Sequence, residues 1–113
     1  MDLNQLGFFQ FDNLVQGRVP FILINMGADL SHIYKGFVAQ HLQNVTIDCN
    51  SSSEAVSKVL EKKLPNHYAV VVIDHDGSRS GPVVTALEKA GCINVYYVKG
   101  GVKGIDLERQ GGN

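Results

Sequence analysis

The stretch Ala69–Ser80 reads AVVVIDHDGSRS and carries the clearest structural signal in the chain. Its first five residues are apolar and mostly β-branched, and an acidic loop with one glycine follows them. A continuous apolar run of this length is typical of a strand that is buried on both faces of a parallel sheet. The stretch therefore predicts a buried strand, a polar loop and the start of a helix.

Three other short runs have the same β-branched or aromatic character, namely Phe21–Ile24, Val45–Ile47 and Asn94–Val98. Segments with helical spacing separate them, so strand and helix alternate along the chain. This alternation predicts a single α/β domain with a parallel sheet of about five strands, right-handed crossovers and helices on both faces. Ligands of such sheets bind beyond the carboxyl ends of the strands, which directs attention to the loops there.

Three helices are expected between these strands. The first contains apolar residues from Ala55 to Leu64, begins with the capping box of Ser51 and Glu54, and ends before Pro65. A second is expected to begin after Asp29 as its N-cap. The third runs from about Ser80 to a C-terminal stop at Gly91.

Length and charge limit the possible classes of protein. The chain has 113 residues, with 10 Lys and Arg against 11 Asp and Glu, so one domain over residues 1–113 is expected. Residues 1–6 and 106–113 are expected to be flexible ends. The balanced charge does not favour nucleic acid or membrane as a partner. With two cysteines and no secretory leader, a cytoplasmic location is expected.

The loop after the most apolar strand is the candidate site. Its consecutive backbone N–H groups, at the start of a helix, predict an anion cradle for a small oxyanion or sulfur anion. Arg79 is expected either to bind that anion or to pair with Asp74. The four histidines are scattered, so neither a metal site nor a cofactor is expected. The candidate residues are Asp74, His75, Asp76, Gly77, Ser78, Arg79 and Ser80.

This loop resembles the active loop of the rhodanese-like domains, whose pattern is Cys-x-x-Gly-x-Arg-Ser after an apolar strand. Here the pattern is Asp74-x-x-Gly77-x-Arg79-Ser80, and a Gly100-Gly101 turn follows the next strand, as in the family. The resemblance implies a doubly wound, five-stranded parallel sheet. It also implies the family activity, which is transfer of a sulfane sulfur through a persulfide on the loop cysteine.

Asp74 stands where that family has its cysteine, and a carboxylate cannot carry a persulfide because the chemistry needs a thiolate. The favoured hypothesis is therefore a pseudoenzyme, a domain without sulfurtransferase activity that binds or regulates a protein partner not identified by the sequence. Whether the chain is an enzyme stays open.

Two enzymatic alternatives remain. Cys49 follows a strand and would supply a non-standard thiol for sulfur transfer, although buried structural roles are expected for both Cys49 and Cys92. The segment Val72–Ser78 also resembles the first motif of haloacid-dehalogenase-like phosphatases. In that interpretation Asp74 is the nucleophile and Asp76 the acid/base, with magnesium. The later acidic pair of that family is missing from Val83–Gly101.

Overall fold

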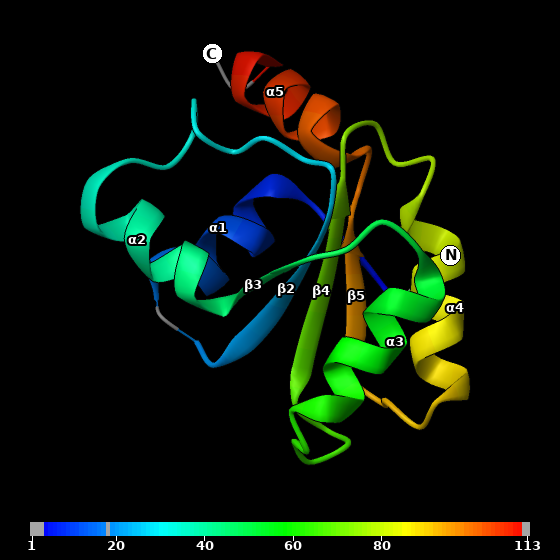
Figure 1. The fold of residues 1–113 in the computed structure, drawn as a ribbon. Coiled ribbons are helices and arrows are strands. Elements are labelled where there is room, and N and C mark those ends of the chain that lie inside the picture. The colour runs from blue at the N-terminus through cyan, green and yellow to red at the C-terminus, as the bar shows by residue number, and fades with distance from the viewer. Residues whose placement is uncertain (1–3, 18, 112–113) are drawn as a thin grey trace.

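The structure is a computed structural model that describes residues 4–17 and 19–111 (Figure 1). A fully parallel sheet in the order β1-β5-β4-β2-β3 forms its centre. The expected five-stranded parallel sheet is therefore confirmed. Its strands are β1 (Gln5–Leu6), β2 (Phe21–Met26), β3 (Thr46–Asp48), β4 (Ala69–Asp74) and β5 (Val95–Val98).

Helices cover both faces of the sheet (Figure 1). One face packs against α3 (Ser52–Glu61) and α4 (Ser80–Lys89), and the other against α1 (Phe8–Gln16), α2 (Gly36–Val45) and α5 (Gly101–Gly111). Strand β4 has no alternation of apolar and polar residues because both of its faces are buried. Val70 and Val72 belong to the first core, whereas Val71 and Ile73 belong to the second. Each of these four side chains therefore enters an apolar layer.

The starts of two helices test the capping predictions. Ser51 caps α3 as expected, because its hydroxyl accepts a hydrogen bond of 3.1 Å from the backbone N–H of Glu54. The other half of the expected capping box differs, since Glu54 Oε1 accepts the N–H of Asn50 instead of that of Ser51. The prediction for Asp29 is wrong, since α2 begins at Gly36 with Lys35 as its N-cap. The Asp29 carboxylate instead accepts the N–H of Ser31 at 2.9 Å, which stabilises a local turn.

Both ends of the chain contain regular structure where flexible ends were expected. Gln5–Leu6 pairs with Tyr97–Val98 as the edge strand β1, and α5 continues to Gly111. The two ends are also joined, because the N–H of Phe8 donates to the Glu108 carboxylate at 2.7 Å. The remaining residues of those predicted ends, 1–3 and 112–113, lie outside the described part of the chain.

The sheet topology decides where a site is possible. In a parallel sheet all carboxyl ends meet at one edge, so the loops after β2, β3, β4 and β5 are neighbours there. Met26 and Asp74, the last residues of the central strands β2 and β4, are paired in register. Within the described residues no helix has the length and apolar character needed to cross a bilayer.

Candidate functional site

Asp74 ends β4 and is completely buried. Its Oδ1 accepts the backbone N–H of Gly77 at 2.8 Å, and its Oδ2 accepts those of Arg79 at 2.7 Å and Ser80 at 3.1 Å. A buried carboxylate needs such donors because it has lost its hydration, and the start of α4 adds a favourable dipole. Of the loop N–H groups expected to face one centre, those of Gly77, Arg79 and Ser80 do so, and the carboxylate of Asp74 accepts them. The N–H of Ser78 donates to Asp76 instead.

Glycines bring the turn after β5 against this carboxylate. Gly77 has φ +91° and a Cβ on it would lie 3.0 Å from the Cα of Gly100. Gly101 has φ +61°, and a Cβ there would overlap the carbonyl oxygen of Asp74 and come within 2.6 Å of its Oδ1. Only glycine fits this approach, so the turn helps to seal Asp74 from solvent.

Arg79 is exposed, and its guanidinium bonds to two backbone carbonyl groups outside its own loop. Nη1 donates to the carbonyl oxygen of Met26 at 3.1 Å, and Nη2 donates to that of Asn50 at 2.7 Å. The expected tie between Arg79 and Asp74 is made by the backbone N–H of Arg79, and the guanidinium forms no ion pair with that carboxylate among the described residues. The guanidinium links the end of β2 to the loop after β3.

The other loop residues have separate roles. His75 is exposed, and its carbonyl oxygen accepts the N–H of Lys103 at 3.0 Å. Asp76 accepts the hydroxyl of Ser78 at 2.6 Å and its N–H at 3.0 Å, and these two bonds lower the pKa of Asp76. The hydroxyl of Ser80 is buried without a hydrogen-bond partner among the described residues.

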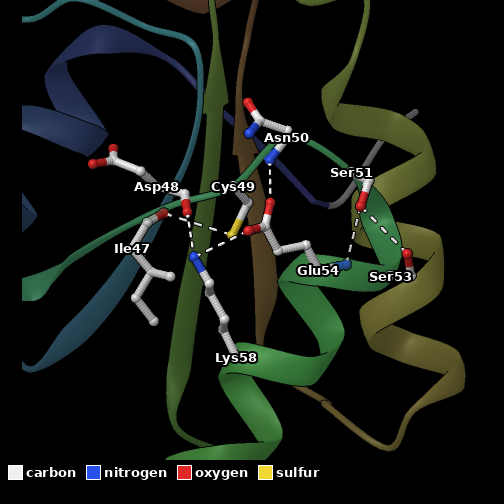
Figure 2. Close-up of polar contacts among 8 residues, drawn as sticks. All are labelled: Ile47, Asp48, Cys49, Asn50, Ser51, Ser53, Glu54 and Lys58. Carbon is white, nitrogen blue, oxygen red and sulfur yellow. Dashed lines mark hydrogen bonds and ion pairs between the residues drawn. The ribbon is translucent and has the colours of Figure 1, made fainter.

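Cys49 lies at the same edge of the sheet, directly after β3 (Figure 2). It is only 3% exposed, and its Sγ donates to the carbonyl oxygen of Ile47 at 3.8 Å. Burial raises the pKa of the Cys49 thiol, while the nearby Lys58 ammonium opposes the shift. The expectation of a buried thiol is confirmed for Cys49, which is protonated at neutral pH.

The Lys58 ammonium is held by two other groups (Figure 2). It donates to the carbonyl oxygen of Asp48 at 2.9 Å and lies 3.1 Å from Glu54 Oε2. Glu54 Oε1 also accepts the N–H of Asn50 at 2.6 Å. Sequence analysis missed this pair, although its i, i+4 spacing is a recognisable signal. The bonds of Arg79 had no such signal, because every residue carries a carbonyl acceptor.

Cys92 follows α4 at the opposite end of the sheet, as expected. It is half-buried, and burial raises the pKa of its thiol. Both cysteines are free thiols. No group of three or more His, Cys, Asp or Glu side chains within the described residues is arranged to hold a metal ion.

The sequence model of the rhodanese-like domain family matches residues 25–108. The chain belongs to the rhodanese-like domain family. Solved structures agree on the fold of this rhodanese-like domain. A rhodanese-like domain from Anabaena sp. is 14% identical with a TM-score of 0.64, over 95% of this chain and 75% of that one.

Two proteins from Saccharomyces cerevisiae are also similar to this rhodanese-like domain. An uncharacterized protein is 15% identical with a TM-score of 0.63, covering 99% of this chain and 96% of its own. A single-domain sulfurtransferase is 17% identical with a TM-score of 0.61, and the match covers 100% of this chain and 95% of that one. Identities this low establish the fold alone. No curated protein sequence matches this chain.

Proposed function

We propose that this rhodanese-like domain does not transfer sulfane sulfur through its β4–α4 loop and acts as a binding or regulatory module. One observation carries the proposal, namely that the Asp74 carboxylate accepts the backbone N–H groups of Gly77, Arg79 and Ser80. In this proposal Asp74 replaces the loop cysteine of the family. A carboxylate has no polarisable sulfur to accept a sulfane atom, and it fills the place of a bound anion.

A second candidate function is sulfur transfer through Cys49. The position of Cys49 supports this candidate, because the carbonyl oxygen of the next residue, Asn50, accepts a hydrogen bond from the Arg79 guanidinium of the β4–α4 loop. Against it stand the burial of the thiol and its raised pKa, which both reduce the thiolate available for attack. Phosphatase chemistry at Asp74 is disfavoured too, since a phosphoryl group must reach the nucleophile and Asp74 is completely buried.

The first experiment is the intact mass of the folded protein after incubation with thiosulfate. We expect an unchanged mass for the protein and for its Cys49→Ser and Cys92→Ser variants. A gain of one sulfur atom that disappears in Cys49→Ser would overturn the proposal and assign the activity to that thiol. Phosphatase turnover that depends on magnesium and is lost in Asp74→Asn would overturn it in favour of the other enzyme class.

The second experiment restores a thiol to the loop with Asp74→Cys, and Asp76→Cys is the matched control two residues away on an exposed position. Because Asp74→Cys vacates the carboxylate position, we expect this variant to bind thiosulfate at the freed N–H groups and the control not to. A persulfide on the introduced thiol would form by transfer of the outer sulfur of thiosulfate, with release of sulfite. A folded Asp74→Cys protein that neither binds thiosulfate nor gains sulfur would contradict the idea of a closed sulfur-transfer loop.

A further inference from the structure

A cavity of about 300 Å³ opens at the end of the sheet opposite to Asp74. It lies between the end of α3, the segment that leads into β4 and the turn between α4 and β5. Its lining is mainly apolar and includes Val59, Leu60, Leu64, Val70 and Ala90, together with the half-buried Cys92. The volume is at the lower end of the ~300–1,000 Å³ typical of small-molecule sites.

Hydrogen bonds between two loops hold the walls of this cavity in place. The N–H of Ile93 donates to the carbonyl oxygen of Asn66 at 2.9 Å. The side-chain amide of Asn94 donates to the carbonyl oxygen of His67 at 3.0 Å. The segment before β4 is thereby fastened to the segment before β5. A cavity with fixed walls loses little conformational entropy when a ligand enters it.

The mouth of the cavity is apolar on the side of α3. Leu60 is 54% exposed and Leu64 is 37% exposed, although their helical spacing predicted burial with Ala55 and Val59. Both leucines line the cavity, so a ligand there would remove their side chains from water.

The lining of the cavity contains one charged residue. Lys63 is the only charged residue in its lining, and it forms no ion pair among the described residues. Its backbone has φ +53°, because it follows the C-cap residue of α3 in the left-handed conformation. The lining therefore combines mainly apolar residues with one charged residue, Lys63, which is exposed to solvent.

We propose that this cavity binds a small carboxylate with an apolar body, such as a short fatty acid. The apolar body fills the space between α3 and Cys92, and the carboxylate pairs with the Lys63 ammonium. This site is separate from the β4–α4 loop and does not depend on the function proposed for it.

Alkylation of Cys92 by iodoacetamide provides the readout, since Cys92 is more accessible than the buried Cys49. Hexanoate at roughly ten times its Kd is expected to slow alkylation of Cys92 about tenfold by mass action. Acetate, which has the head group without the body, is expected to give no protection at the same concentration. Absence of protection by hexanoate at any soluble concentration would overturn the proposal.

Three variants locate the ligand. Lys63→Asn keeps a residue that tolerates the left-handed conformation and is expected to weaken hexanoate binding about fivefold. Lys62→Asn, the neighbouring lysine outside the lining, should leave the affinity unchanged. Ala90→Leu fills the cavity from an exposed position and should abolish protection.

Equal binding of hexanoate by Ala90→Leu and the unmodified protein would overturn the location. Equal binding of hexanol and hexanoate would overturn the role of Lys63. A dimer in sedimentation that shields Cys92 without any added ligand would overturn the small-molecule proposal in favour of a second copy of the chain.

Discussion

Two carboxylates at the same edge of the sheet accept backbone N–H groups in opposite surroundings. Asp74 after β4 is completely buried and accepts three N–H groups. Glu54 in α3 is partly exposed, accepts the one N–H of Asn50 and pairs with the Lys58 ammonium. The two sites use the same type of bond, but only Asp74 is itself completely buried, and one of its three donors, the N–H of Ser80, is buried with it.

The comparison indicates that the burial of a carboxylate, more than the number of its hydrogen bonds, determines how much stability the fold loses when that carboxylate is removed. If Glu54 is removed, water can hydrate the N–H of Asn50 and the ammonium of Lys58. If Asp74 is removed, the N–H of Ser80 in particular stays inside the protein without an acceptor. The loop after β4 is therefore expected to be rigid and intolerant of substitution, and the loop after β3 to be adaptable.

The largest expected effect comes from Gly101→Ala, which tests how tightly the Asp74 site is closed. A Cβ would overlap the Asp74 carbonyl oxygen, and the residue would keep φ +61°. The free energy of unfolding, measured with urea, is expected to fall by more than about 3 kcal/mol. Gly81→Ala is the matched control, because a Cβ there meets no atom within 4 Å and stability should be unchanged or slightly higher. Equal stability of the two variants would contradict the close approach.

Asp74→Asn should have the next largest effect. It keeps one acceptor oxygen but turns an amide N–H₂ toward a backbone N–H, so at least one backbone donor loses its acceptor. The free energy of unfolding should fall by about 2–4 kcal/mol. Asp76→Asn, on the exposed part of the same loop, should change it by less than about 1 kcal/mol. A similar decrease in the free energy of unfolding for both variants would contradict the role of burial at Asp74.

Arg79→Met sharpens the comparison because this side chain connects the two loops. The variant loses the bonds to the carbonyl oxygens of Met26 and Asn50, which solvent can partly replace since Arg79 is exposed. A loss of about 1–2 kcal/mol is expected, with faster amide hydrogen exchange in the loop after β3. Unchanged exchange there would contradict the connection.

The smallest effect is expected for Glu54→Gln. The N–H of Asn50 and then the Lys58 ammonium lower the pKa of Glu54 below its ordinary value of 4.5. The folded state therefore binds this proton less tightly than the unfolded state. The resulting stabilisation is present above pH 4.5 and is lost as the pH falls through the lower folded value. The stability difference between the protein and Glu54→Gln should shrink with acidification.

Glu61→Gln is the control for this pH dependence. Glu61 lies in the last turn of the same helix, and among the described residues it bonds neither to the N–H of Asn50 nor to the Lys58 ammonium. The same acid-dependent difference in Glu61→Gln would trace the effect to the general charge of α3 rather than to the contacts of Glu54.

Local sequence determined the features that depend on neighbouring residues. The uninterrupted apolar run of β4 was sufficient to predict a two-faced parallel sheet, because each of its side chains needs an apolar layer. The Ser51 cap of α3 also followed from a short-range bond between residues close in the chain, and the expected start of the next helix near Ser80 agrees with α4. The resemblance at Gly77, Arg79 and Ser80 pointed to the correct family.

Tertiary structure alone decided the features that join distant segments. The guanidinium of Arg79 bonds to carbonyl oxygens that any residue would provide, so no side chain marked its partners. The fit of Gly101 against Asp74, the exposure of Leu60 and the start of α2 at Gly36 likewise depend on how elements pack. The physical reason is that hydrophobic periodicity and capping act over a few residues. Backbone acceptors and steric fit become specific only when the sheet has brought remote loops together.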